Sequence, residues 1–559
     1  MAVAAIASRL TGFLAKLAFL AVFGAAMVNS SYTLANTLPN IVFELLIGGV
    51  LSSVAIPLLA RAQRSDPDGG TAYTQRLVTL GFVGLVLATV LAVAAAPLIT
   101  KLYLTPGTEV SAELTTDLAY LLLPQILFYG LAALFGAILN TKERFAAQAW
   151  APVLNNLVLI CVSVGFVLIW RNEPETLTRA QVLFLGIGTT AGIALQAAVM
   201  LPSLRRSGFR FKWRFGWDKR MAEAGALAGW AVLYVIVSQI GYAATTRTLS
   251  AEASGISIFA YASLLFQMPY GILGVSILTA IMPRMSRHAA AGEMHLVKQD
   301  MSLATRLSAM ALLPVTGGIL ALAGAIGVAA SAYGRVSVET GIIIGIVLAA
   351  LAIGLLPLAV SLVQMRVFYA MKDGRTPVLI NVIMMAVRVA LISLAAAMFH
   401  GSDREVEWLI AAMALATALS YVVGAVVGEI WLRRRFGPMG TRRVLVTVGK
   451  MGLASAVGGL AAWGTVQLAW GGFPDSMVEA LLQCATAGVV GVSVIASVAL
   501  ILGVEELDPI VNRLAGRRRP RPAGTAGSPP QPGTVGTPPP DQKAGSGDVE
   551  RLRRRHRAR

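Results

Sequence analysis

Apolar residues occur along this chain in long continuous runs that short polar segments separate. Most runs reach about 20 residues, the length that a helix needs to cross the hydrocarbon core of a bilayer. Because the runs are continuous rather than alternating, they predict spanning helices and exclude a transmembrane β-barrel. We expect fourteen spans, at residues 5–28, 33–60, 77–99, 115–139, 147–170, 181–203, 223–246, 254–282, 304–333, 338–365, 377–399, 408–432, 447–470 and 477–503.

The positive charge of the loops gives these spans an orientation. Counted together with the first four residues of the following span, loops after even-numbered spans hold 25 Lys and Arg residues, whereas loops after odd-numbered spans hold six. Cytoplasmic loops of membrane proteins carry an excess of Lys and Arg, and one miscounted span early in the chain would remove the bias. We therefore expect an even number of spans, with the N and C termini both in the cytoplasm.

Composition agrees with a chain that lies mostly in lipid. Of 559 residues, 56% are hydrophobic and only 13% are charged, which leaves too few polar groups to cover a water-facing surface. The net charge is +18, and the basic segment 204–220 (LRRSGFRFKWRFGWDKR) carries interleaved aromatic residues. Nucleic-acid binding would also use such a segment. We favour a loop at the lipid surface, with no nucleic acid as partner, because aromatic side chains anchor at the interface and cations meet anionic head groups.

The two cysteines, Cys161 and Cys484, both fall in apolar runs. Their spacing suits neither a metal site nor a disulfide framework, so we expect them to pack as small core residues. No Gly-x-x-x-x-Gly-Lys-[Ser/Thr] loop is present, which argues against transport driven by the chain's own ATP hydrolysis. We expect no cofactor, and an ion gradient, the membrane potential or substrate flux as the source of work.

Two pairs of segments recur at nearly one offset. Residues 151–156 (APVLNN) resemble residues 376–381 (TPVLIN), and residues 48–57 resemble residues 274–283. The offsets are 225 and 226 residues, which predicts two similar six-helix halves. Such repeats place the substrate path at their interface.

The expected fold class is therefore an all-α polytopic membrane protein with two pseudo-symmetric six-helix bundles and two further C-terminal helices. We expect a first bundle with its basic loop at 1–220, a second at 221–443, spans 13 and 14 at 444–505, and a disordered basic cytoplasmic tail at 506–559. The tail is rich in Pro, Gly and Arg, and such a segment cannot bury enough apolar area to fold alone.

Ionisable residues within spans are the sharpest functional signal, because a charge at the centre of a bilayer costs about 2.5–3.5 kcal/mol. Arg9 and Lys16 are seven residues apart in span 1, and so share one helix face. They either line a cationic cavity for an anionic head group, or Arg9 reaches the interface while Lys16 pairs with Glu44 of span 2. Arg388 lies well inside span 11 and is a further candidate.

Spans 2 and 8 also combine polar side chains with residues that bend helices. Proline removes a backbone hydrogen bond, and glycine lets helices approach closely. Bent helices at matching places in two halves are the usual sign of a binding site in transporters, although Gly and Pro are also frequent in ordinary membrane helices. The candidates that line the cavity are Asn36, Asn40, Ser263 and Gln267, and the candidate hinge residues are Pro39, Gly48, Gly49, Pro269 and Gly271.

Several of these segments resemble the MurJ (MviN) family of lipid II flippases, particularly its actinobacterial branch. The resemblance rests on residues 8–13 (SRLTGF), 36–40 (NTLPN), 44–53 (ELLIGGVLSS), 136–141 (GAILNT), 151–155 (APVLN) and 269–275 (PYGILGV), which occur in the family's order and lie in spans 1–12. The family belongs to the multidrug/oligosaccharidyl-lipid/polysaccharide exporter superfamily. The resemblance implies a transporter rather than an enzyme, placed in the bacterial cytoplasmic membrane.

The resemblance implies outward movement of the undecaprenyl-pyrophosphate-linked peptidoglycan precursor by alternating access, in cell-wall synthesis and cell shape. It also implies a cationic cavity between the bundles and a groove for the lipid tail at spans 13 and 14. Arg9 falls on the first arginine that the family is thought to use for pyrophosphate. The other three fall on Ala15 (with Lys16 next to it), Phe43 and Leu264, and an acidic residue usual after span 1 falls near Ser30.

Three functions follow from these residues. The first is a lipid II flippase that binds a lipid-linked pyrophosphate saccharide and membrane lipids. The second is a flippase or exporter of another lipid-linked saccharide or amphiphile. The third is a transport-inactive membrane scaffold for proteins of cell-wall synthesis.

Overall fold

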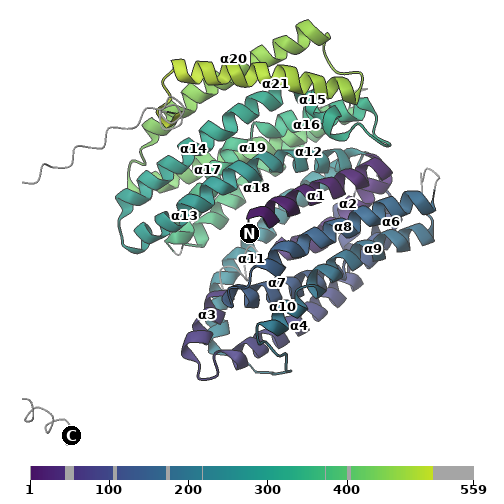
Figure 1. Ribbon diagram of the computed structural model, residues 1–559, viewed down its shortest axis with the longest axis vertical. Helices are drawn as coiled ribbons and strands as arrows, with labels where there is room; N and C mark the ends of the chain where they lie inside the picture. The colour runs from purple at the N-terminus through teal and green to yellow at the C-terminus, as the bar shows by residue number, and fades with distance from the viewer. Residues whose placement is uncertain are drawn as a thin grey trace, which may run out of the picture. The chain divides into compact units, whose positions relative to one another are not determined.

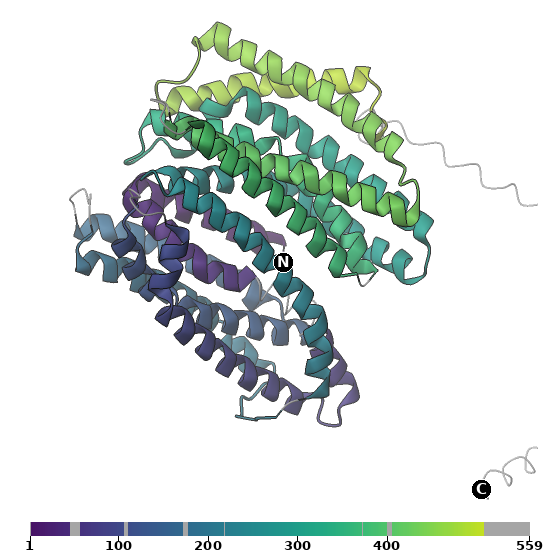
Figure 2. The ribbon, with the colours of Figure 1, turned by 180° about the vertical axis from the view of Figure 1, so that it is seen from behind.

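The computed structural model describes residues 2–44, 56–104, 110–170, 177–216, 218–371, 373–399 and 405–507. Within these ranges the chain forms helices and turns without a strand (Figures 1 and 2). The first half contains α1 (Ala2–Phe23), α2 (Met27–Glu44), α3 (Ile56–Ser65), α4 (Thr71–Ala94), α5 (Ala96–Tyr103), α6 (Ala112–Leu122), α7 (Gln125–Thr141), α8 (Ala146–Ile169), α9 (Arg179–Ala198) and α10 (Leu201–Arg206).

The chain continues with the long helix α11, at the start of the expected second bundle, which we call the second half. Its elements are α11 (Lys219–Leu249), α12 (Gly255–Pro269), the π-helical turn η2 (Tyr270–Gly274), α13 (Val275–Ala290), α14 (Met294–Ala321), α15 (Ala323–Ser331), α16 (Val338–Ala352), α17 (Leu355–Ala370), α18 (Arg375–Phe399) and α19 (Glu405–Phe436). Two further long helices, α20 (Thr441–Trp470) and α21 (Met477–Ile501), precede the short turn η3 (Glu505–Leu507).

Each of the fourteen expected ranges holds at least one of these helices. Among the described residues, ten helices are long and apolar enough to cross a membrane, and the count is eleven if the bent pair α16–α17 forms one span. The chain is therefore an all-helical polytopic membrane protein. The number fourteen stays a prediction.

Helix breaks recur at equivalent places in the two halves. In span 3 a break at Ala95 separates α4 from α5, and in span 9 a break at Leu322 separates α14 from α15. In span 4 a break at Leu123 separates α6 from α7, and in span 10 a break at Ile353 separates α16 from α17 with a bend of 44°. These pairs are 227 and 230 residues apart, close to the offset that the sequence repeat predicts.

Two asparagine side chains make matching contacts in the two halves. Asn156 Nδ2 on α8 donates to the Ser8 carbonyl and to Thr11 Oγ1 of α1, both at 3.0 Å. Asn381 Nδ2 on α18, 225 residues later, donates to the Tyr234 carbonyl at 2.9 Å and to Ser238 Oγ of α11 at 2.8 Å. In each half the fifth expected span is thus tied to the first by one amide.

We expect the two asparagines to contribute similarly to stability. Asn156→Leu and Asn381→Leu each remove a pair of interhelical hydrogen bonds, which are worth about 1 kcal/mol between membrane helices. Each change should lower the unfolding free energy of the purified protein by about that amount, measured by denaturant titration in detergent micelles. Thr465→Val is the control, because the Thr465 hydroxyl bonds only to the Ala461 carbonyl of its own helix. An asparagine variant as stable as this control contradicts the prediction.

Helices α20 and α21 pack against each other and against the second half, through α14 and α15 (Figure 1). Small residues permit the contact with α14. A Cβ at Gly317 would lie 2.6 Å from the Ser455 carbonyl oxygen, and one at Gly459 would lie 3.0 Å from the Gly317 carbonyl oxygen. Close backbone approach at small residues is the usual way in which membrane helices gain packing energy.

One expectation about the apolar runs is wrong. Cys161 is exposed on the surface of α8, whereas Cys484 on α21 is partly buried. Both cysteines lie on apolar helices. A helix segment with apolar residues on every face has no polar positions that would distinguish its lipid-facing residues from its buried residues. Hydrophobicity alone therefore does not separate core from surface in this chain.

Candidate functional site

The candidate site begins where α1 of the first half meets η2 of the second. Arg9 lies on the exposed side of α1. A Cβ added at Gly271 would overlap Arg9 Nη1 and would lie 3.0 Å from Arg9 Cζ. The guanidinium therefore lies directly over the Gly271 backbone, in space that any other residue would fill. Two residues that the sequence singles out separately are thus neighbours across the two halves.

Proline explains the shape of this part of span 8. Pro269 ends α12 and donates no backbone hydrogen bond, so the regular pattern of the α-helix is interrupted there. The chain continues as the π-helical turn η2 before α13 begins at Val275. Such turns are frequent at functional sites. On the preceding turns of α12, Gln267 is exposed and Ser263 is half-buried.

Tyr270 connects a second arginine to this site. The Tyr270 hydroxyl lies within electrostatic reach of Arg366 and of Arg9. Arg366 is exposed on α17, and neither arginine has an ion-pair partner among the described residues. Sequence reasoning missed Arg366, because it follows the expected end of span 10 by one residue. The structure extends that helix to Ala370, which places Arg366 inside it.

The predicted polar residues of span 2 lie on α2. Asn40 Nδ2 donates to the Asn36 carbonyl at 2.7 Å, next to Pro39 inside the helix. Asn36 Oδ1 is buried and has no hydrogen-bond partner among the described residues. Glu44 ends α2, but its side chain, like Gly48 and Gly49, lies outside what the structure describes. The roles predicted for those three residues therefore stay predictions.

Lys16 and Arg388 have different surroundings. Lys16 is exposed on α1, and its backbone carbonyl accepts a hydrogen bond from Tyr261 Oη at 3.1 Å. Arg388 on α18 is only 9% exposed, and its Cδ lies 3.6 Å from the place of a Cβ at Gly241. Arg388 Nε is buried without a hydrogen-bond partner among the described residues. Arg388 is thus enclosed within the second half, and its predicted role in substrate binding stays a prediction.

Hydrogen bonds between the two halves gather toward one end of the helices. Ser30 Oγ on α2 donates to the Ala253 carbonyl at 2.6 Å and accepts from the Ser257 N–H at 3.3 Å. The Arg335 N–H donates to the Ala21 carbonyl at 3.0 Å. These residues lie in or next to loops that follow odd-numbered spans. We call the contacts of Ser30, Ala253 and Ser257 the loop-side seal.

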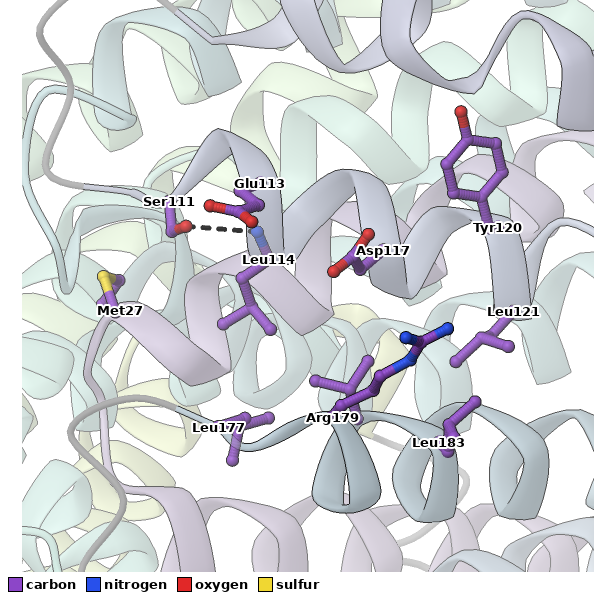
Figure 3. A pocket seen from close by; sticks show the side chains of 11 residues that line it. Met27, Ser111, Glu113, Leu114, Asp117, Tyr120, Leu121, Leu177, Arg179 and Leu183 are labelled. Carbon is purple, nitrogen blue, oxygen red and sulfur yellow. Dashed lines mark hydrogen bonds between the residues drawn. The ribbon is translucent and has the colours of Figure 1, made fainter.

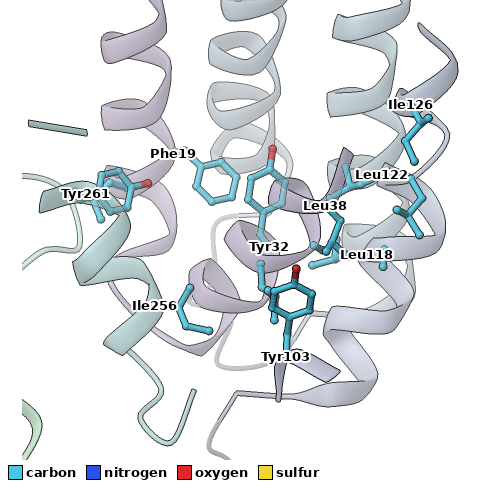
Figure 4. Packing of buried hydrophobic residues seen from close by; sticks show 14 of the residues in the cluster. Phe19, Tyr32, Leu38, Tyr103, Leu118, Leu122, Ile126, Ile256 and Tyr261 are labelled. Atoms are coloured by element: carbon cyan, nitrogen blue, oxygen red, sulfur yellow. The ribbon is translucent and has the colours of Figure 1, made fainter. Parts of the chain in front are cut away.

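Apolar packing continues from the seal into the helices. Tyr261 and Ile256 of α12 lie beside Phe19 and Tyr32 of the first half (Figure 4), and all four are buried in one hydrophobic cluster. The rings of Phe19 and Tyr32 stack with centroids 4.2 Å apart. Deeper along α2, Tyr242 Oη donates to Thr37 Oγ1 at 3.2 Å. The two halves are therefore closed against each other at this end.

A separate cavity of about 690 Å³ lies between α6 and α9, on the first half alone. Asp117 of α6 and Arg179 of α9 point into it from opposite walls, and Glu113 lies near its rim (Figure 3). No ion pair joins these described side chains. In the described part of the chain, no group of three or more His, Cys, Asp or Glu residues is placed to hold a metal ion.

The chain is similar to known proteins over most of its length. The family model described as "Lipid II flippase MurJ" matches residues 19–482. The "Probable lipid II flippase MurJ" of Rhizobium meliloti (strain 1021) is 25% identical over 424 residues, covering 74% of this chain and 78% of the relative. The protein of the same description from Haemophilus influenzae is 25% identical over 474 residues, covering 82% and 89%.

Solved structures show the same fold. "Lipid II flippase MurJ, inward closed conformation" superposes with a TM-score of 0.71 at 18% identity, covering 91% of this chain and 99% of that chain. An inward-facing multidrug resistance MATE family transporter of the MOP superfamily superposes with a TM-score of 0.60 at 14% identity, covering 78% and 96%. The family model alone spans well over half of the sequence. The chain therefore belongs to the lipid II flippase MurJ family.

Proposed function

We propose that this protein is a flippase that moves lipid II, the undecaprenyl-pyrophosphate-linked peptidoglycan precursor, from the inner to the outer leaflet of the cytoplasmic membrane. It is a transporter and not an enzyme. The observation that carries the proposal is the position of Arg9 against Gly271, because this places a guanidinium that has no ion-pair partner among the described residues at the junction of the two halves. A guanidinium binds phosphate oxygens through two parallel hydrogen bonds.

The mechanism we propose is alternating access between two six-helix halves. Fourteen spans with both termini in the cytoplasm would place the loops after odd-numbered spans outside the cell. The loop-side seal would then be the closed outer gate of an inward-facing state, with Arg9 open to substrate from the inside. Opening requires the Ser30 contacts to break and matching contacts to form at the inner end.

The cationic side chains at the proposed pyrophosphate site occupy different positions from those of the family pattern. Ala15, at the place of the second family arginine, is only 1% exposed, so a charged side chain would not fit there without a partner. Arg366 lies on α17, which packs against η2, and interacts electrostatically with Tyr270. We propose that Arg9 and Arg366 share the work of neutralising the pyrophosphate. We also propose that a coupling ion or the membrane potential supplies the work of transport. Proteins of cell-wall synthesis are the proposed partners.

The altered cation positions also favour a second candidate, a flippase of another lipid-linked saccharide. Leu264 stands at the place of the arginine in span 8 and is half-buried and apolar. A substrate with a single phosphate would need fewer cations than a pyrophosphate. The two candidates differ in which lipid-linked substrate appears outside the cell.

Complementation tests the proposal. Production of this protein in a bacterium depleted of its own lipid II flippase should restore both growth and exposure of the precursor in the outer leaflet. Arg9→Ala, produced at the same level, should restore neither. If the parent protein reaches the membrane in full amount and no precursor appears outside, the first candidate is wrong for that substrate.

The contact of Arg9 with Gly271 gives a further prediction. Gly271→Ala places a methyl group where the guanidinium lies, and the flexible arginine side chain then moves aside. Loss of one charge-assisted hydrogen bond corresponds to a loss of about tenfold or more in transport rate. Gly318→Ala is the control, because a Cβ there meets nothing within 4 Å. Equal transport by the two variants, at equal thermal stability, contradicts the placement of Arg9.

A further inference from the structure

A cavity far from Arg9 in the sequence lies under the basic loop between α10 and α11. The loop is held against α4 by two hydrogen bonds. Gln75 Nε2 donates to the Arg210 carbonyl at 2.9 Å, and the Arg214 N–H donates to Thr79 Oγ1 at 3.2 Å. Both partners on α4 are buried. The loop therefore has a defined path along the helix and is more than a charged linker.

The cavity beneath this loop holds about 700 Å³, which is within the range of ligand pockets. Its floor is apolar, and two arginines stand at its rim. We call it the loop cavity, and it is lined by Val78, Phe82, Leu131, Phe135, Leu201, Leu204, Arg205, Phe209, Arg210, Phe211 and Trp213. The combination of an apolar floor with a cationic rim matches an amphiphile that carries negative charge at one end.

The two rim arginines are available for a ligand. Arg205 ends α10, Arg210 follows in the loop, and both are exposed. Neither has an ion pair with a described acidic residue. A soluble phosphate would use the arginines but leave the apolar floor empty. A neutral lipid would fill the floor but leave the arginines without a counter-charge.

Aromatic side chains continue the apolar surface outward from the cavity. The ring centroid of Trp213 lies 5.6 Å from that of Phe82 and 4.9 Å from that of Phe211. Trp213 is 58% exposed and Phe215 is 68% exposed. Lys212 and Arg214 alternate with these aromatic residues along the sequence. Exposed aromatic rings with interleaved cations are typical of a segment at the membrane interface.

We propose that the loop cavity binds one phospholipid with an anionic head group, distinct from the transported substrate. The phosphate lies between Arg205 and Arg210, and an acyl chain lies against Phe82, Leu131 and Phe135 on the cavity floor. A bound lipid would fill the space between α4, α7 and the loop, and so tie the first half to the inner surface of the membrane. None of the residues of the Arg9 site takes part in it.

Quenching of Trp213 fluorescence by brominated lipid tests this proposal. The full-length protein is placed in phosphatidylcholine nanodiscs that contain a small fraction of either brominated phosphatidylglycerol or brominated phosphatidylcholine. The difference between parent protein and Trp213→Phe isolates the emission of Trp213 from the other tryptophans. We expect the phosphatidylglycerol to quench this component at a several-fold lower fraction. Equal quenching by the two lipids overturns the proposal.

Variants that change the charge or the shape of the loop cavity distinguish a specific lipid site from general attraction between the basic loop and anionic lipid. Arg205→Gln and Arg210→Gln should each raise the half-quenching fraction about fivefold. Arg206→Gln is the matched control, because Arg206 is an equally exposed neighbour outside the cavity lining. Leu131→Phe should weaken quenching by filling the floor without a change of charge. An Arg206→Gln effect as large as that of Arg205→Gln, or no effect of Leu131→Phe, overturns a specific site.

A competition arm distinguishes phospholipid from substrate. Unlabelled phosphatidylglycerol should reverse the quenching at a concentration similar to that of the brominated form. Undecaprenyl phosphate should compete no better than phosphatidylglycerol. Displacement by undecaprenyl phosphate at a far lower concentration would make the loop cavity a substrate site, and the proposal of a separate lipid would be wrong.

Discussion

Arg9→Gln is expected to slow outward transport of a pyrophosphate-linked lipid by about ten- to a hundredfold. Glutamine keeps most of the length of the side chain but loses the charge and the paired donors. A hydrogen bond to a charged group contributes about 1.5–3 kcal/mol, which corresponds to that range of rates if it acts in the rate-limiting state. Stability should change little, because Arg9 is exposed and has no described ion-pair partner.

Two controls accompany this variant. Arg9→Lys keeps the positive charge but not the paired donors, so it should retain intermediate activity. Arg64→Gln removes an equally exposed arginine from the end of α3 and should transport like the parent. Transport is measured as the amount of precursor accessible from outside, normalised to protein in the membrane. Normal transport by Arg9→Gln would show that the Arg9 site does not hold the pyrophosphate.

A reversible cross-link across the loop-side seal should abolish transport. Ser30 Oγ lies 3.3 Å from the Ser257 nitrogen, and both residues are fully buried. Ser30→Cys with Ser257→Cys, in a background that lacks Cys161 and Cys484, places two thiols across the junction of the halves. Oxidation would hold that end shut, and an alternating-access transporter with one end locked completes no cycle. Reduction should restore transport to the level of the unoxidised protein.

The single-cysteine variants are the matched controls for this cross-link, because the same oxidant should leave their transport unchanged. Formation of the disulfide is followed by the altered mobility of the protein on a non-reducing gel after proteolysis between the two positions. A cross-linked protein that still transports at the parent rate would show that the seal does not need to open. The proposed outer gate would then be wrong, although the fold and the family would stand.

The sequence predicted the helices well because burial in lipid leaves a strong and continuous apolar pattern. The matched segments 151–156 and 376–381 carry asparagines with matching contacts, in keeping with the predicted repeat, while the division into two six-helix bundles stays a prediction. The breaks at Ala95 and Leu123 were not predicted. They fall inside apolar runs, where a change of helix direction leaves no signal in hydrophobicity.

The site was predicted in part. Arg9 and Gly271 were both identified, but nothing in the sequence shows that residues 262 positions apart touch. Arg366 was missed because the expected span ends one residue before it, at residue 365, whereas the helix continues to Ala370. Arg388 was identified for its position, yet its side chain is enclosed within one half. The rotation of a helix about its own axis decides whether a side chain faces the site or the interior of one half. The pattern of apolar residues in one sequence does not show that rotation.

Transbilayer movement of purified lipid II in vesicles that contain only this protein tests the central claim most directly. Accessibility of the lipid to an enzyme or binding protein outside the vesicles gives the rate. We expect the parent protein to move lipid II faster than protein-free vesicles do, and at least about tenfold faster than Arg9→Gln does. Folded parent protein, inserted in the vesicles, that moves lipid II no faster than the protein-free bilayer would contradict the account.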